Sequence, residues 1–326
     1  MSTPIPVAVV GVGSMGKNHA RVYSEMSNVE LVGISDLDEE RGLEYAKQFN
    51  TEYFKDYKEL LSKVKAVNVA VPTSLHHKMA MDFLKNGVHV LVEKPITHSL
   101  KEAKEIVDLA KQNDLVLQVG HLERFNPAVA QLRKMVSNPI YIESHRIGYP
   151  SSRNLDIGVI WDLMIHDFDI LLNIVKSPVA DVRTYGLSLY SSQEDMAVVQ
   201  ILFENGAIAS LFASRISGEK LRQLKVIEAD KTYRLDFIDQ TISIIKLPQA
   251  GHTNPPEFVP IRKSEPLRLE LEHFMDCIVA HKTPMVTGED GKNALQLAIR
   301  AVDNMKIVSM ADSAIAKKFL EIADMG

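Results

Sequence analysis

Asp162 and His166 stand four residues apart in a stretch that is otherwise strongly apolar. On a helix this spacing places two side chains on one face about one turn apart, where a carboxylate can orient an imidazole and stabilise its cation. The pair therefore predicts a general base on a helix that faces a cleft. The alternative is a buried pair whose hydrogen bonds are satisfied internally. A metal site that includes Asp169 would need further ligands, so we predict no metal.

Lys94 is the next candidate, in the sequence Glu93-Lys94-Pro95. It follows an apolar segment, residues 89–92, that we predict to be a strand of a parallel sheet. Ligands of such sheets bind at the carboxyl ends of the strands, where a lysine can donate a hydrogen bond to a substrate hydroxyl. The alternative is a surface lysine beside a turn.

The third group is Gly11-x-Gly13-x-x-Gly16, between an apolar strand and a helix. In that context the glycines make a tight turn, admit a pyrophosphate and allow close packing of helix and strand, so we predict a dinucleotide site. Asp36 ends the second strand, where a carboxylate binds the adenosine ribose and repels a 2'-phosphate, which favours NAD over NADP. Asp38 could exchange roles with Asp36, one acid binding the ribose and the other capping the next helix.

These candidates require a doubly wound α/β domain to position them. Five short, valine-rich segments alternate with helical stretches, as in a parallel sheet buried on both faces. Ser99 and Glu102 have the spacing of a helix N-terminal cap, and Asn86-Gly87 marks the end of the preceding helix. The predicted strands are Ile5 to Val10, Glu30 to Ile34, Ala66 to Val71, His89 to Val92 and Val116 to Val119.

The pattern changes after about residue 119. Asn126-Pro127 predicts a helix start, followed by a strand over 139–147 and a helix over 161–175. Alternating segments between 182 and 247 predict a large, mostly antiparallel sheet, and two helices close the chain. We therefore predict a dinucleotide-binding Rossmann domain over 1–122, a substrate-binding and oligomerisation domain over 123–326, and a ligand cleft between them.

Composition narrows the class of protein. The 326 residues carry 37 Lys+Arg and 42 Asp+Glu, a formal net charge of -5, which argues against a surface built for nucleic acid or anionic membranes. The single cysteine, Cys277, excludes an internal disulfide. No apolar run is long enough to span a bilayer and the N-terminus does not resemble a secretory signal, so we expect a cytoplasmic protein.

Six motifs in order resemble the glucose-fructose oxidoreductase / inositol dehydrogenase / MocA (Gfo/Idh/MocA) family over essentially the whole chain. They are Gly-x-Gly-x-x-Gly-x-x-His (11–19), Val-Pro-Thr-Ser-Leu-His (71–76), Glu-Lys-Pro (93–95), Gly-His-x-x-Arg-Phe-Asn-Pro (120–127), Asp-x-x-x-His-x-x-Asp (162–169) and Val-Thr-Gly-Glu-Asp-Gly (286–291).

The resemblance implies reversible NAD(P)-dependent oxidation of a secondary alcohol. It implies His166 as the general base, Lys94 binding the reacting hydroxyl and Asp162 orienting these groups. It also implies that the open sheet of the second domain forms homodimer or homotetramer contacts. The implied cofactor-binding residues are Gly11, Gly13, Ser14, Met15, Gly16, Asp36, Val71, Pro72, Thr73, His76, Glu93, Lys94 and Pro95. The implied substrate-binding residues are His121, Arg124, Asn126, Arg146, Arg153, Asp162 and His166.

Within the family, residues 120–127, 146–153 and 161–169 resemble the branch that oxidises C3 of UDP-N-acetylglucosamine. That branch works upstream of an aminotransferase, for instance in lipid A synthesis. Arg124, Arg146 and Arg153 would then be cations for the diphosphate, with internal or surface pairing as the alternative.

Two departures from the family pattern stand out. Residues 163–165 are Leu-Met-Ile where many members have glycines, and Thr73 replaces a common Asn. Two further hypotheses remain: a dehydrogenase of a free sugar or inositol, and a dinucleotide-binding regulatory protein without turnover.

Overall fold

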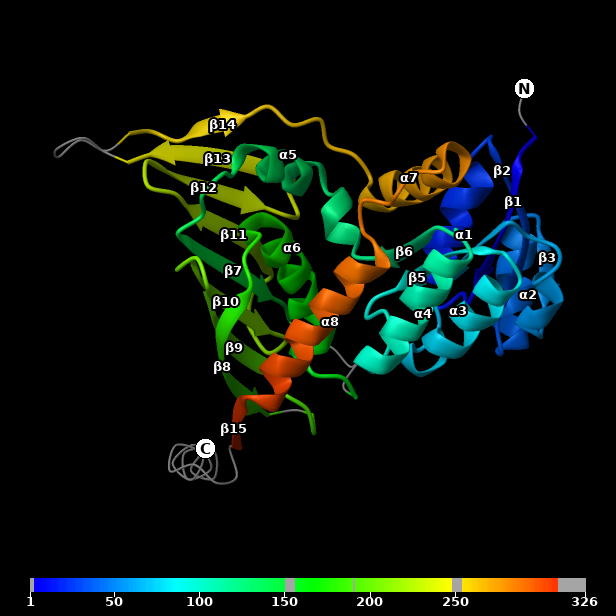
Figure 1. Ribbon diagram of the computed structural model, residues 1–326, viewed down its shortest axis with the longest axis horizontal. Helices are drawn as coiled ribbons and strands as arrows, with labels where there is room; N and C mark the ends of the chain where they lie inside the picture. Colours follow the sequence, from blue (N-terminus) through cyan, green and yellow to red (C-terminus); the bar gives the residue numbers. More distant parts are fainter. Residues whose placement is uncertain (1–2, 150–155, 190, 248–253, 310–326) are drawn as a thin grey trace. The chain divides into compact units, whose positions relative to one another are not determined.

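The computed structural model describes residues 3–149, 156–189, 191–247 and 254–309. The chain divides into two compact units. The first comprises Met1–Phe125 and Ser264–Leu295, and the second comprises Asn126–Lys263 and Gln296–Gly326 (Figure 1). The expected division into 1–122 and 123–326 differs from this most clearly at residues 264–295. This segment returns to the first unit because its helix packs against the first helix of the chain.

A six-stranded parallel sheet forms the centre of the first unit, in the order β3-β2-β1-β4-β5-β6. All five predicted strands are present, and the structure adds the short β3. The central strands are buried on both faces, which explains their high valine content. The strands are β1 (Ile5–Val10), β2 (Val29–Ser35), β3 (Glu52–Phe54), β4 (Ala66–Val69), β5 (His89–Glu93) and β6 (Leu117–Gly120).

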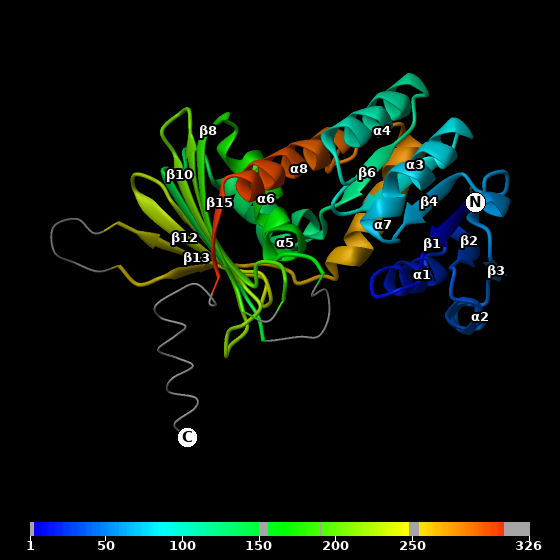
Figure 2. The ribbon, with the colours of Figure 1, turned by 90° about the horizontal axis from the view of Figure 1, so that it is seen from below.

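Helices cover both faces of this sheet, α1 and α2 on one side and α3 and α4 on the other (Figure 2). The Ser99 side chain accepts the Glu102 N–H at the start of α4, and Gly87 follows α3 with a φ of 74°, as predicted. The helices are α1 (Gly16–Glu25), α2 (Glu39–Gln48), α3 (His76–Lys85), α4 (Leu100–Gln112) and α7 (Pro266–Ala280), with 3-10 turns η1 (Tyr57–Leu60), η2 (Thr73–Leu75) and η3 (Leu122–Phe125).

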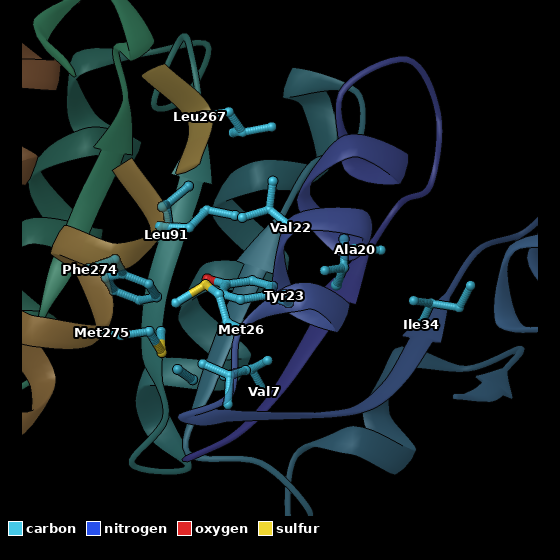
Figure 3. Packing of buried hydrophobic residues seen from close by; sticks show 14 of the residues in the cluster. Val7, Ala20, Val22, Tyr23, Met26, Ile34, Leu91, Leu267, Phe274 and Met275 are labelled. Carbon is cyan, nitrogen blue, oxygen red and sulfur yellow. The ribbon is translucent and has the colours of Figure 1, made fainter. Parts of the chain in front are cut away.

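The hydrophobic core of this unit joins α1, the sheet and α7 (Figure 3). Val22 and Tyr23 of α1 are buried together with Leu91 of β5 and with Leu271 and Phe274 of α7. Burial of each large apolar side chain contributes about 1.5–3 kcal/mol. This core fixes α1 against the sheet, and with it the glycine turn at the start of α1.

The second unit is built on a nine-stranded sheet in the order β14-β13-β12-β11-β7-β10-β9-β8-β15. As predicted, most pairs are antiparallel; β7 with β10 and β8 with β15 are parallel. The short strand β14 and the final strand β15 lie outside the segments predicted as strands. The strands are β7 (Tyr141–Ile147), β8 (Val179–Ser188), β9 (Met196–Phe203), β10 (Ile208–Ser214), β11 (Leu221–Ile227), β12 (Lys231–Asp236), β13 (Thr241–Lys246), β14 (Glu257–Val259) and β15 (Met305–Ser309).

Two helices, α5 (Pro127–Met135) and α6 (Ile165–Val175), lie against one face of this sheet (Figure 2). Asn126 accepts the Ala128 N–H at the start of α5, which confirms the predicted cap. A π-helical turn, η4 (Ile160–Met164), leads directly into α6. Helix α8 (Gly288–Asp303) begins in the first unit and ends in the second. Among the described residues, no helix is long and apolar enough to cross a membrane.

Candidate active site

The three glycines of the first turn have different surroundings. Gly11 has a φ of +84°, and a Cβ there would lie 2.5 Å from the Ala70 carbonyl oxygen. A Cβ on Gly16 would lie 1.7 Å from the Gly11 carbonyl oxygen, so α1 approaches the turn more closely than any side chain permits. A Cβ on Gly13 would meet nothing within 4 Å. Gly13 thus leaves the backbone accessible to a ligand.

The N-terminus of α1 lacks a side-chain cap. Met15 occupies the capping position and forms no side-chain hydrogen bond there, and the first turn contains no acidic residue. Ser14 contributes its carbonyl to the Asn18 side chain. Uncapped N–H groups and the positive end of the helix dipole form an anion-binding site. These residues therefore fit the pyrophosphate of a dinucleotide.

Asp36 and Asp38 have separate roles. Asp38 caps α2 by accepting the Arg41 N–H at 3.1 Å. Asp36 accepts the Val12 N–H at 2.8 Å and the Arg41 guanidinium at 2.7 Å. Burial would raise the pKa of Asp36, but the hydrogen bonds from Arg41 and from two backbone N–H groups hold the pKa below its usual value. An ionised Asp36 therefore lies beside the glycine turn, and Asp38 is the cap.

The loops after β4 and β5 are joined by His76. Its Nε2 lies 2.8 Å from the Val71 carbonyl oxygen and its Nδ1 lies 2.9 Å from the Pro95 carbonyl oxygen. Burial lowers the pKa of His76, and the two carbonyls oppose that change. Pro72 and Thr73 form the start of η2 between these contacts. His76 is thus a buried brace between two segments of the predicted cofactor site.

Glu93 is tied to the helix that follows the glycine turn. Its Oε1 lies 3.0 Å from His19 Nε2, and the amide of Asn68 lies 2.7 Å from the other ring nitrogen of His19. Since the Tyr23 hydroxyl donates to the Asn68 oxygen, the amide donates to His19 Nδ1 and leaves a proton on Nε2 for Glu93. Burial would raise the pKa of Glu93, but His19 and the charge of Lys94 hold it below its usual value.

Lys94 follows β5 at the carboxyl end of the sheet, as predicted. His121 follows β6, the neighbouring strand, and is buried. Burial, with smaller effects from the charges of Arg124 and Lys94, lowers the pKa of His121 to about 3. His121 is therefore neutral near Lys94.

Asp162 lies on η4 and His166 lies at the start of α6. The Asp162 N–H donates to the Gly158 carbonyl at 3.0 Å. Both side chains are partly exposed, whereas Met164, Ile165 and other neighbours are buried. The structure therefore places two partly exposed polar residues in a segment whose buried residues belong to the core.

Two of the three predicted cations, Arg124 and Arg146, have internal partners. Arg124 is 3% exposed and donates to the Met285 carbonyl at 2.9 Å. Arg146 is 2% exposed, and its Nε donates to both carboxylate oxygens of Asp167 at 2.9 and 2.8 Å. These arrangements match the alternative of internal pairing. Asn126 is also buried, as a helix cap, and Arg153 lies outside the described residues.

Two charged residues of the first unit, Arg41 and Glu270, are absent from the predicted set. Arg41 pairs with Asp36, and the sequence signal was an arginine within the first turn of the helix that Asp38 caps. Glu270 on α7 is fully buried in the first unit, and burial together with the charge of Glu93 raises its pKa well above the usual value. The neighbours of Glu270, Gln118 and Glu93, lie far from it in the sequence, so no local pattern indicates its burial.

Comparison with known proteins assigns both units to one family. Residues 5–121 match the model described as "Oxidoreductase family, NAD-binding Rossmann fold", and residues 142–233 match "GFO/IDH/MocA C-terminal domain". The chain is 34% identical over 297 residues to UDP-N-acetylglucosamine 3-dehydrogenase of Acidithiobacillus ferrooxidans, covering 90% of this chain and 94% of the relative. A solved structure of that enzyme has a TM-score of 0.87 at 33% identity, covering 93% of this chain and 98% of the other. Scyllo-inositol 2-dehydrogenase (NAD(+)) of Bacillus subtilis is 28% identical over 327 residues, covering 94% of this chain and 95% of the relative.

Proposed function

Because the chain belongs to the Gfo/Idh/MocA family of oxidoreductases, we propose that it oxidises the C3 hydroxyl of a nucleotide-linked sugar, UDP-N-acetylglucosamine, with NAD as the acceptor. It is an NAD-binding dehydrogenase that acts on CH–OH groups, as its named relatives are. The substrate proposal depends on one observation: the similarity to UDP-N-acetylglucosamine 3-dehydrogenase extends over nearly the whole length of both chains.

The cofactor half of the site consists of the glycine turn and the carboxyl ends of the strands. Backbone N–H groups at the start of α1 are the donors for the pyrophosphate, with Gly13 leaving room for its approach. The ionised carboxylate of Asp36 can accept hydrogen bonds from the ribose hydroxyls, and its negative charge repels a 2'-phosphate. A dinucleotide held by these residues would supply the hydride acceptor for the oxidation.

The proposed chemistry uses three side chains. His166 takes the hydroxyl proton, and Asp162, one turn earlier, orients the imidazole and stabilises its cation. Lys94 donates a hydrogen bond to the substrate oxygen and stabilises the negative charge that develops as the proton leaves. His121, being neutral, adds no positive charge next to Lys94.

Arg124 and Arg146 are not included in the proposed diphosphate site. Both guanidinium groups are buried in internal pairs, and removing Arg146 from Asp167 would leave a buried carboxylate without its cation. Arg153 remains a prediction for the diphosphate. The proposed substrate site therefore differs from the one expected from the sequence in two of its three cations.

We further propose that the exposed face of the nine-stranded sheet forms a contact between copies of the chain. Leu202 of β9 and Ile208 of β10 are cross-strand neighbours, and they are 43% and 46% exposed. Adjacent exposed apolar side chains on a sheet favour association. The proposed coupling to an aminotransferase follows from the substrate, because a 3-keto product is what such an enzyme would consume.

The test is formation of NADH from NAD and UDP-N-acetylglucosamine by the purified protein, with a carbonyl trap to remove the keto product. Lys94→Ala and His166→Ala should each abolish turnover, and His166→Ala should leave the dissociation constant for NAD nearly unchanged. Lys101→Ala and His281→Ala, at exposed positions, are the matched controls. A protein that binds the UDP-sugar in calorimetry but forms no NADH would contradict the enzymatic proposal.

A second candidate substrate is an inositol, because scyllo-inositol 2-dehydrogenase is similar over almost the full length of both chains. The same assay with scyllo- and myo-inositol separates the two candidates. Turnover of an inositol without turnover or binding of the UDP-sugar would refute the nucleotide-sugar proposal and retain the dehydrogenase assignment.

A further inference from the structure

The start of η4 is held by a single residue from a distant loop. The main-chain carbonyl of Glu194 accepts a hydrogen bond from the Val159 N–H at 3.1 Å, and the side-chain Oε1 of Glu194 accepts one from the Ile160 N–H at 3.0 Å. The first N–H groups of a helix have no partner within the helix, so they need acceptors from elsewhere. Glu194 supplies two acceptors from between β8 and β9, and it is 3% exposed.

Gly158 has no side chain, and the Glu194 carboxylate occupies the space that a side chain would fill. A Cβ at Gly158 would lie 2.0 Å from Glu194 Oε1 and 2.1 Å from Oε2. Gly186 of β8 lies on another side of the same residue, where an added Cβ would be 3.3 Å from Glu194 Cβ. The two glycines therefore allow a buried acid to reach the end of η4.

The loop that carries Glu194 is itself fixed by its neighbour Asp195. Asp195 Oδ2 accepts the Leu189 N–H at 2.7 Å and the Ser191 N–H at 3.1 Å. Its carbonyl accepts the Arg215 N–H at 2.9 Å, and the Arg215 guanidinium donates to the Ile157 carbonyl. Both the loop and the chain before η4 are thus attached to the end of β10.

The π-helical turn determines how the helix presents its polar residues. The Ile165 N–H bonds to the Ile160 carbonyl, five residues earlier, and α6 begins at Ile165. A π turn contains one more residue than an α turn, and each residue of an α-helix rotates the chain by about 100°. If η4 became α-helical, the angle about the helix axis between the Asp162 and His166 side chains would change.

We propose that Glu194 is a positioning residue that holds η4 in its π-helical register and thereby orients Asp162 and His166 for proton abstraction. This inference rests on the proposed function of those two residues. Glu194 does not touch the reacting atoms in this proposal. Its contribution is the pair of hydrogen bonds at Val159 and Ile160.

The experiment compares Glu194→Ala, Glu194→Gln and the exposed neighbour Gln193→Ala, which serves as the control. Glutamine retains an Oε1 acceptor, so Glu194→Gln should remain within about threefold of the wild-type kcat. Glu194→Ala should lower kcat by about ten- to a hundredfold, in line with a misplaced catalytic group. The dissociation constant for NAD should not change, because the cofactor residues belong to the other unit.

Gly158→Ala tests the same contact from the opposite side. Its added methyl group should displace the Glu194 carboxylate and lower kcat, and this defect should be smaller in a Glu194→Ala background, where the methyl group has room. Amide exchange of residues 159–165 should accelerate in Glu194→Ala and Gly158→Ala but not in Glu194→Gln. If Glu194→Ala does not fold, the kcat and amide exchange of Gly158→Ala decide.

The outcomes separate this inference from the proposed function. A wild-type protein without dehydrogenase turnover refutes the proposed function, and exchange at 159–165 still reports whether Glu194 holds η4. A wild-type enzyme that turns over, with wild-type kcat and exchange in folded Glu194→Ala, refutes the positioning role.

Discussion

Glu270 offers the most direct test of the buried electrostatics in the first unit. It is fully buried on α7, and among the residues that the structure describes neither of its carboxyl oxygens has a hydrogen-bond partner. Burial, and then the charge of Glu93, raise its pKa well above the usual value of 4.5. We therefore expect Glu270 to be protonated in the folded protein at a pH where it is ionised in the unfolded chain.

The sign of the pH dependence follows from this difference in pKa. Above pH 4.5 the folded state retains a proton that the unfolded state has lost, so the free energy of unfolding falls as pH rises towards the folded-state pKa. One proton corresponds to at most about 1.4 kcal/mol per pH unit, or about 2.7 kcal/mol between pH 6 and pH 8. Glu270→Gln removes this dependence because an amide does not titrate in that range.

The assay is thermal unfolding without ligand at pH 5, 6, 7 and 8, a range that begins just above the unfolded-state pKa. At about 2–4 °C per kcal/mol, the Tm difference between Glu270→Gln and wild type should grow by up to about 5–10 °C between pH 6 and pH 8 in favour of the variant. Asp276→Asn, exposed on the same helix, is the control and should follow the wild type. Equal pH slopes for Glu270→Gln and wild type would refute the assignment of a buried, protonated carboxyl group.

Three further predictions concern the cofactor site of the first unit and a buried ion pair of the second. Gly13→Ala should fold with the wild-type Tm but bind NAD more weakly in calorimetry, whereas Gly16→Ala, with its Cβ 1.7 Å from a carbonyl oxygen, should lower the Tm. Asp36→Ala should raise the NAD dissociation constant by about tenfold. It should also reduce the ratio of the NADP to the NAD dissociation constant, measured in paired titrations. Arg146→Ala should destabilise the second unit by about 3–5 kcal/mol in denaturant unfolding, because Asp167 remains buried without its cation.

The sequence predicted those parts of the fold that depend on local pattern. The buried strands, the caps at Ser99 and Asn126 and the glycine turn each rest on residues that are neighbours in the chain, and all are present. The family resemblance likewise depended on short motifs, and both family models match. Local rules sufficed wherever the interacting groups lie within a few residues of each other.

The roles of the charged residues depended on partners that lie far apart in the sequence. Arg146 was predicted to bind a diphosphate, but its guanidinium forms an ion pair with Asp167 of α6. Spacing alone allows either Asp36 or Asp38 to cap α2; the hydrogen bonds from the Val12 N–H and Arg41 hold Asp36 at the glycine turn instead. A charge in a sequence can be assigned to a ligand only when its internal partners are known.

The segment that carries Asp162 and His166 shows that even a local conformation can depend on a residue far away in the sequence. Their spacing of four predicted a shared helical face, yet the turn between them is π-helical, which no propensity scale indicates. Glu194 accepts an N–H at the start of that turn, and the absence of a side chain at Gly158 leaves room for its carboxylate. If the proposed positioning role is correct, substitutions at Glu194 should affect catalysis more than stability, although this residue belongs to none of the motifs that identify the family.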